Sequence, residues 1–364
     1  MKKSLCTFPI VVISLFVLFP SSAVAQEDRQ LKEKITASER LLKAKWKSFL
    51  QRRAEPAELS AVENTRFSQP PMRRRLATES TETFESPTES VKADGQHRLV
   101  VRHATNRIGD DEVFLRSYNG GLVGPTIRAK PGETLKIKLI NQLADEPEHT
   151  GDHNSLHEFN TTNLHTHGLH VSPSGNSDNV LLKIKPGEEF DYEIKIPEDH
   201  ACGTFWYHAH KHGAVAAQVA SGMSGALIIE GGMDEVEQIK NAQERVLVLQ
   251  QIPYFNQGLA QGVIEPEYAG DLFGPGDWDT LGRFTTVNGK ILPVINMNPG
   301  EVERWRIVNS AFRERIQLKL ERDTGTGPEI MTLREIAVDG LPLGKVVDKT
   351  QLELWPGYRS DVLV

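Results

Sequence analysis

Apolar and charged residues alternate along short runs of the chain after residue 96. Arg98–Arg102, Leu135–Ile140 and Phe190–Ile196 each place apolar side chains at every second position. Pro-Gly-Glu turns at Pro131 and Pro186 precede two of these runs. A period of two, interrupted about every ten residues by Pro, Gly or Asn, is typical of antiparallel strands in β-sandwiches.

A second series of such runs begins near residue 245. It comprises Val246–Leu249, Pro293–Asn296, Val302–Val308, Glu335–Val338 and Ser360–Val364, with another Pro-Gly-Glu turn at Pro299. We therefore expect an all-β fold of two related sandwiches in tandem, over residues 96–235 and 240–364, with the boundary near residues 231–242. The last run has no turn or polar tail after it, so we expect a truncated second domain.

The first 25 residues read as a secretory signal. A basic start at Lys2 and Lys3, an apolar stretch and the end Ala23-Val24-Ala25 predict cleavage after Ala25 and export to the periplasm or medium. The apolar stretch is short for a membrane span, so we expect none after cleavage. Loss of the two lysines makes the mature chain more acidic than the formal charge of −7, which argues against a nucleic-acid partner.

Residues 26–95 differ from the rest in composition. Residues 26–55 carry apolar side chains spaced by three or four, which predicts an amphipathic helix, either solvated or lying on a membrane surface. Residues 64–95 are rich in Ser, Thr, Glu and Pro, which predicts a disordered linker.

Cysteine usage excludes an internal disulfide framework in the mature chain. Cys6 lies in the predicted signal, which leaves Cys202 alone. We interpret Cys202 as a small buried hydrophobic residue, with a disulfide to another molecule as the alternative.

Two His-x-His pairs carry the candidate chemistry. His165 and His167 form the first pair, and His208 and His210 the second, each within an apolar run. In a strand, residues i and i+2 point to one face roughly 7 Å apart, so one pair does not easily bind a single ion. Imidazole suits copper, zinc, iron and nickel. We expect two facing pairs to hold a cluster of metals, each pair serving two ions.

Five further histidines have less specific sequence contexts. Outer-shell or surface positions are expected for His170 and His212. His149, His153 and His157 lie in a polar loop, where we expect solvated side chains, with an accessory metal site as the alternative.

The paired motifs resemble the first two copper motifs of the multicopper oxidases, and more the bacterial exported laccase-like enzymes than the fungal laccases. They read His165-Thr-His167-Gly168 and Thr204-Phe-Trp-Tyr-His208-Ala-His210. The resemblance extends over about residues 97–364, including Gly124–Glu133, Ser221–Glu230, Val287–Gly289, Pro299–Arg306 and Val338–Pro342.

The resemblance implies three cupredoxin sandwiches with a trinuclear copper cluster between the first and third. It assigns His165 to the type 2 copper, and His167, His208 and His210 to the two type 3 coppers. Asp178 matches an acid near the cluster, which would orient a copper-bound water or relay a proton. The alternative for Asp178 is an ordinary residue of a polar turn.

The type 1 copper motif is not present in these 364 residues. There is no His-Cys-His, and all twelve histidines lie between His97 and His212. This fits a metal-free middle domain, whereas two-domain laccases and nitrite reductases require ligands from their second sandwich. Met223 resembles a type 1 methionine of nitrite reductases, but without a Cys beside the strand histidine we interpret it as core.

The function implied is coupling of one-electron oxidation of a reducing substrate to four-electron reduction of O2 to water. Phenols, aromatic amines and low-valent metal ions all remain open as substrates, because the substrate pocket adjoins the type 1 copper. We expect residues 1–364 alone to be an inactive fragment. The alternative is a non-catalytic copper-binding or scaffold remnant of such an enzyme.

Overall fold

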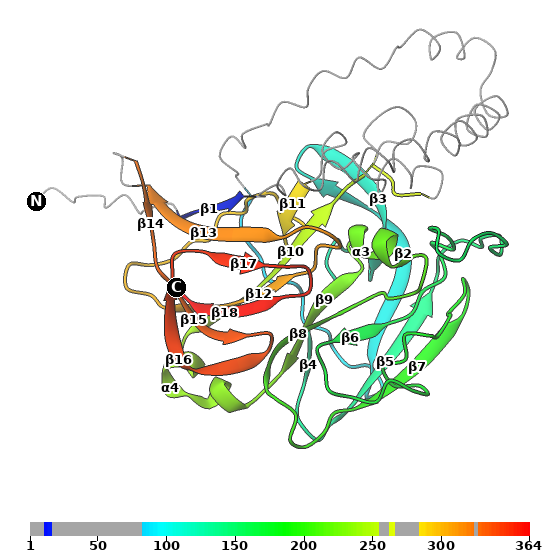
Figure 1. The fold of residues 1–364 in the computed structure, drawn as a ribbon, viewed down its shortest axis with the longest axis horizontal. Helices are drawn as coiled ribbons and strands as arrows, with labels where there is room; N and C mark the ends of the chain where they lie inside the picture. The colour runs from blue at the N-terminus through cyan, green and yellow to red at the C-terminus, as the bar shows by residue number, and fades with distance from the viewer. Residues whose placement is uncertain (1–10, 17–81, 255–261, 266–283, 324–326) are drawn as a thin grey trace, which may run out of the picture.

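The computed structural model describes residues 11–16, 82–254, 262–265, 284–323 and 327–364 (Figure 1). The predicted helix over 26–55 and most of the predicted linker lie outside these residues. The predicted signal overlaps them only at β1 (Val11–Phe16), which pairs antiparallel with β13 (Ile316–Asp323).

Two four-stranded sheets form the first sandwich. One sheet has the order β3 (Asp111–Tyr118), β2 (His97–Ile108), β5 (Thr134–Asn141) and β7 (Glu189–Lys195). The other has the order β4 (Ile127–Ala129), β9 (Ser224–Ile229), β8 (Gly203–His208) and β6 (His165–His167). Their alternating apolar residues face each other and exclude water from one core, which includes Leu99, Ile137, Tyr192, Phe205 and Leu227.

A second sandwich follows along the chain. Its larger sheet has the order β11 (Phe284–Val287), β10 (Gln243–Ile252), β12 (Glu303–Asn309), β18 (Arg359–Leu363), β15 (Leu333–Val338) and β16 (Leu341–Lys349). In the other sheet β13 pairs with β1, β14 (Pro328–Ile330) and β17 (Leu352–Leu354). The core between the sheets includes Leu247, Trp305, Ile307, Leu318 and Val362. The predicted all-β tandem of sandwiches is confirmed.

The two sandwiches pack directly against each other. The connection between β9 and β10 contains a 3-10 turn η1 (Gly232–Glu235) and a short helix α4 (Glu237–Lys240). Ala226 and Ile228 of β9 pack against Val246 and Val248 of β10 in a small buried cluster. A second contact forms around α3 (Val215–Ala220), whose alanines join a cluster with residues of β2, β3 and β10. The second sandwich therefore covers part of the face of the sheet containing β9 that points away from the first core.

Two predictions about secondary structure need correction. The linker predicted to reach residue 95 is ordered from residue 82 onward, because Phe84 is buried in the second core and Thr83 bridges to Val294. The strand predicted at residues 293–296 is only this isolated bridge. Pro293 lacks a backbone N–H donor, so the run cannot form a continuous ladder on both sides.

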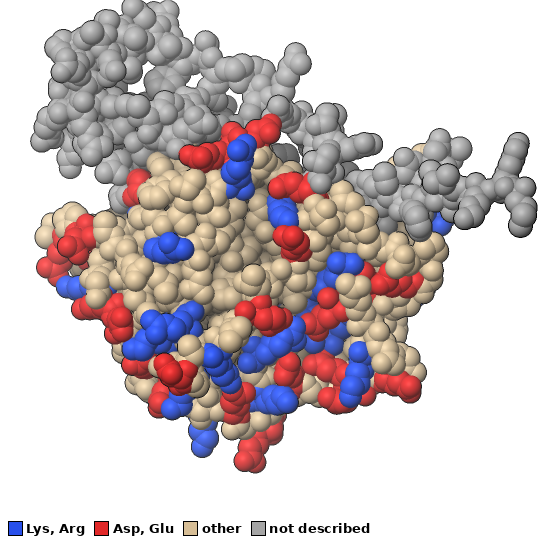
Figure 2. Space-filling view, turned by 180° about the vertical axis from the view of Figure 1, so that it is seen from behind, with Lys and Arg blue, Asp and Glu red and all other residues tan. Residues whose placement is uncertain are grey.

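Charged side chains of both signs are interspersed over the described surface in Figure 2. Many of them pair, as Arg128 does with Glu89 and Glu244. Basic residues do not gather there into a single-sign patch, which agrees with the acidic composition. Among the described residues, the structure contains no helix that is both long and apolar enough to cross a membrane.

Candidate metal centre

The two histidine pairs lie on neighbouring strands of one sheet. β6 and β8 run antiparallel, with His165 opposite His208 and His167 opposite Trp206. Opposed residues share a face of the sheet, and so do residues two apart in one strand. The three histidine rings and the Trp206 ring therefore lie on one face, while Phe205 lies in the core beneath them. The sequence predicted one face for each pair, and the strand register aligns the two pairs.

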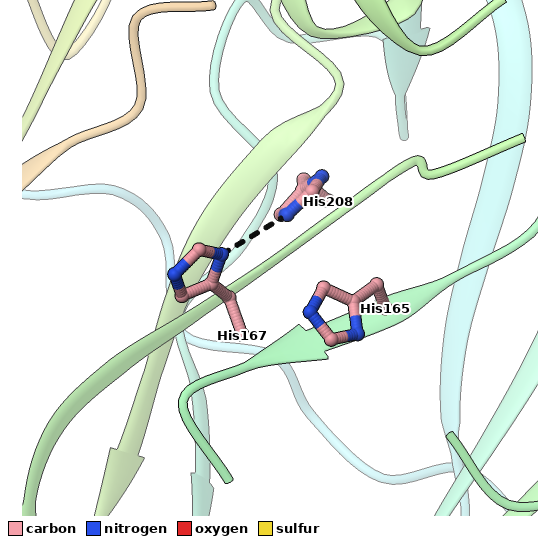
Figure 3. Close-up of side chains that lie close together, drawn as sticks. All are labelled: His165, His167 and His208. Carbon is pink, nitrogen blue, oxygen red and sulfur yellow. Dashed lines mark hydrogen bonds between the residues drawn. The ribbon is translucent and has the colours of Figure 1, made fainter. Parts of the chain in front are cut away.

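The imidazole rings converge on a common point (Figure 3). His165, His167 and His208 each offer a ring nitrogen, and the three nitrogens lie within 4.8 Å of one another. The closest approach joins Nδ1 of His167 to Nε2 of His208 at 3.4 Å. The ring of His210 lies 5.1 Å from that of His165 and 5.5 Å from that of His208, measured between centroids. All four predicted histidines thus belong to one cluster.

Asp178 is buried against the cluster. Its carboxylate lies 2.9 Å from Nδ1 of His165 and accepts the backbone N–H of Thr166 at 2.8 Å. With the carboxylate as acceptor, Nδ1 of His165 carries the hydrogen, and Nε2 is the nitrogen left to face a metal ion. Carboxylates beside metal-binding histidines fix the ring in this way and increase its basicity.

His208 is oriented by the main chain. Its Nδ1 lies 2.9 Å from the carbonyl oxygen of Ala209, which leaves Nε2 as the nitrogen with a lone pair. That nitrogen is the one directed at His167. The hydrogen-bond partners of His165 and His208 therefore expose the nitrogens that a metal ion would need.

The surroundings favour the neutral form of three of the histidines. Burial, followed by the positive charge of Arg359, lowers the pKa of His167 to about 4. Burial also holds the pKa of His208 well below its usual range and lowers that of His210. Since metal ions bind deprotonated imidazole, these three lowered pKa values favour metal binding. The donor set fits copper, which imidazole ligands suit.

The site contains residues that sequence reasoning missed. Trp206 stacks on His208 with ring centroids 4.2 Å apart and lies 4.8 Å from His167. Its position two residues before His208 places it on the same face, so strand alternation would have identified it. Gly357 lies against His167, since a Cβ there would be 2.9 Å from the ring. Gly357 and Arg359 come from the second sandwich, and no sequence pattern connects them to the histidines.

Gly168 ends the first motif for a steric reason. Its φ of +88° lies in the left-handed region, and an added Cβ would lie 2.6 Å from Nη2 of Arg359. The chain can therefore turn away from the sheet directly after His167 while Arg359 stays close to the site.

Other residues singled out from the sequence lie away from the cluster. Met223 is fully buried in the first core, which confirms its interpretation. Cys202 is a free thiol, partly buried beside that core, where burial raises its pKa. His170 is exposed, and its backbone N–H donates to Nε2 of His200 at 2.9 Å.

Comparison with known proteins gives the family. Residues 100–233 match the family model described as "Multicopper oxidase". Multicopper oxidase mco of Staphylococcus aureus is 28% identical over 248 residues, which cover 68% of this chain and 47% of the relative. Laccase-1 of Thanatephorus cucumeris is 30% identical over 256 residues, covering 68% of this chain and 40% of the relative.

Solved structures show the same fold. The multi-copper oxidase from Pediococcus acidilactici superimposes with a TM-score of 0.62 at 22% identity, covering 82% of this chain and 58% of that one. The laccase-like multi-copper oxidase CueO from Ochrobactrum sp. gives 0.56 at 25% identity, covering 77% and 57%. The fold is therefore that of the cupredoxin-type sandwiches found in these multi-copper oxidases. The chain belongs to the multicopper oxidase family, and it spans about half the length of the first curated relatives it matches.

Proposed function

We propose that this chain supplies one side of a trinuclear copper centre in an oxidase that reduces O2 to water. His165 would serve the type 2 copper, and His167, His208 and His210 the type 3 coppers. Bound copper would supply the one-electron steps that deliver four electrons from a reducing substrate to O2. The observation that carries this proposal is the convergence of three imidazole nitrogens within 4.8 Å.

The residues of the chain contribute orientation and charge. Asp178 would hold His165 with Nε2 toward the ion, and it is also the nearest carboxylate for relaying a proton to the centre. Trp206 covers the His167 and His208 rings on one side and excludes water there. Arg359 adds a fixed positive charge, which favours neutral His167.

Four imidazoles are too few ligands for three copper ions. Each copper of a histidine-rich site takes several nitrogen ligands, and the sequence after His212 contains no further histidine. We therefore propose that the remaining ligands and the electron-entry copper come from outside these 364 residues. Residues 96–235 and 240–364 would then be the first two cupredoxin domains, the second free of metal.

The reducing substrate is proposed only by class. Phenols, aromatic amines and low-valent metal ions are the candidates, with O2 as the acceptor. The relative from Ochrobactrum sp. is described with oxidase activity towards lignin model compounds and lignosulfonate. We also propose export directed by residues 1–25, which N-terminal sequencing of the secreted protein would test by showing a start at Gln26.

The function is tested by comparing two proteins. The complete gene product and the chain 1–364 are loaded with copper and assayed for copper content and for O2 consumption with a phenol. We expect both to bind copper and only a gene product with a downstream His-Cys-His to consume O2. Turnover by the chain 1–364 alone would contradict the proposal that it holds only part of the copper ligands. A gene that stops after Val364 would favour the alternative, a non-catalytic remnant of such an enzyme.

A further inference from the structure

A second group of histidine rings forms beside the copper motifs. His149, His153 and His157 come from the connection between β5 and β6, and His212 follows the second copper motif. Ring centroids are 5.7 Å apart for His149 and His153, 5.9 Å for His153 and His157, and 6.2 Å for His157 and His212. His149 and His157 stack at 4.2 Å. The predicted solvated loop is thus folded into a compact cluster.

Three of these rings each hold one nitrogen against a backbone carbonyl. The contacts join Nε2 of His149 to Asp152 at 3.0 Å, Nδ1 of His157 to Ser155 at 2.7 Å and Nε2 of His212 to His153 at 2.9 Å. A carbonyl oxygen only accepts, so these nitrogens carry the hydrogen and the other nitrogen of each ring has a lone pair. Metal-binding histidines typically donate their second ring N–H in this manner.

His200 provides a contrast within the same structure. Its Nδ1 lies 2.8 Å from the carbonyl oxygen of Ala201, and its Nε2 accepts the backbone N–H of His170. Both ring nitrogens are therefore used within the protein. His149, His157 and His212 differ because each uses only one ring nitrogen in these hydrogen bonds.

The loop is fixed to the segment that carries the second copper motif. The backbone N–H of His157 donates to the carbonyl of Gly213 at 2.9 Å, and Lys211 pairs with Glu158 at 2.5 Å. Gly213 has a φ of +86°, and a Cβ there would lie 2.2 Å from the His157 ring. His157 is 6% exposed, whereas His153 and His212 are exposed to solvent. The cluster thus has one buried, hydrogen-bonded histidine, His157, and a side that is open to solvent at His153 and His212.

The spacing of the ring centroids is close to what one ion requires, although the ring nitrogens must turn towards one another before they can bind it. A metal–nitrogen distance of about 2 Å places the centroids of two imidazoles on a tetrahedral ion roughly 5 Å apart. His149, His153 and His157 lie 4.2 to 5.9 Å from one another, and His212 lies 6.2 Å from His157. His149 and His157 are stacked with their planes 17° apart, so one ring must rotate out of the stack before both can bind. His149 is only partly buried and is the ring with room to turn.

We propose that His149, His153, His157 and His212 form a second transition-metal site that takes a copper or zinc ion. It uses none of the histidines of the candidate copper centre and does not depend on the proposed oxidase function. The ion enters from solvent on the side of His153 and His212, and His157 forms the base of the site. All donors are imidazole nitrogens, which select such ions over Mg²⁺ or Ca²⁺.

The test counts ions bound by metal-free full-length protein at pH 7. Cu(II) sulfate is added, loosely held metal is removed by dialysis, and copper is measured by mass spectrometry. We expect His153→Gln/His212→Gln to bind one equivalent less than the wild type, and His170→Gln, a change at another exposed histidine, to bind the same amount. A His165→Ala/His208→Ala variant should retain one Cu(II) with nitrogen hyperfine splitting in its EPR spectrum.

Two results would overturn the proposal. One is an unchanged copper count in the His153→Gln/His212→Gln variant, and the other is the absence of a nitrogen-ligated Cu(II) signal in the His165→Ala/His208→Ala variant. Circular dichroism of the metal-free proteins shows whether each variant is folded. If the double variant is not, His149→Gln supplies the same comparison from the other end of the loop. Repeating the titration with zinc chloride distinguishes a general site from one selective for copper.

Discussion

Nδ1 of His167 lies 3.4 Å from Nε2 of His208, although 41 residues separate the two in the chain. The contact depends on the pairing of β6 with β8. This pairing sets His165 opposite His208 and brings His167 next to His208. Each motif alone offers only a pair of rings on one strand. The pairing of the two strands brings them together into one cluster of imidazole rings.

Replacement of His208 should remove metal from the candidate centre. His208→Ala deletes the imidazole whose Nε2 faces His167, so we expect copper content to fall while the neighbouring rings remain. Mass spectrometry of the dialysed protein measures the loss. His170→Ala serves as the control, and equal copper in both variants would show that His208 is not a ligand.

Asp178→Asn should weaken metal binding without removing a ligand. The amide keeps the size of the carboxylate but loses the negative charge that fixes His165. Loss of such a partner typically costs 10- to 100-fold in metal affinity, so we expect a decrease of about that size in a chelator competition. Asp191→Asn, which changes an exposed carboxylate paired with Lys138, should leave the affinity unchanged.

The pKa of His167 predicts how acid affects the fold. This pKa is about 4 in the folded protein, below the value of about 6.5 in an unfolded chain. The unfolded state therefore binds more protons between these values, and the metal-free protein should lose stability as pH falls from 6.5 towards 4. Urea unfolding across this range measures the effect. If stability were flat there, neutral burial of His167 would be wrong.

Arg359, which lies in the second sandwich, should help to lower the pKa of His167. Arg359→Gln removes a positive charge near His167, so the pKa of His167 should rise, although burial, the larger cause, continues to hold it below the usual value. A proton NMR titration of the imidazole signals follows the change. Arg315→Gln, at a surface pair with Glu353, is the matched control and should leave the titration unaltered.

Asp361 should be important for holding the sandwiches together. It is buried, pairs with Arg304 at 2.7 Å and Arg306 at 3.3 Å, and accepts the hydroxyl of Thr204 at 2.6 Å. Asp361→Ala leaves buried guanidinium groups with fewer partners, so we expect a loss of about 3 kcal/mol in the free energy of unfolding. Asp191→Ala breaks an exposed pair and should leave the free energy of unfolding nearly unchanged, as measured by urea denaturation.

Local patterns in the sequence determined the all-β class, the tandem arrangement and the identity of the clustered histidines. Strand alternation and turn residues act over a few positions, so they can be read without a structure. Alternation also places His165 with His167 on one face, and it would have placed Trp206 with His208.

Tertiary structure decided how these parts meet. The register of β6 against β8, the approach of Gly357 and Arg359 to His167, and the folding of His149, His153 and His157 towards His212 all join residues distant in sequence. Segments such as residues 82–95 also lack a regular pattern, yet Phe84 completes the second core. These contacts depend on which surfaces pack together, and burial and hydrogen bonding over the whole fold select them, so no local pattern reveals them.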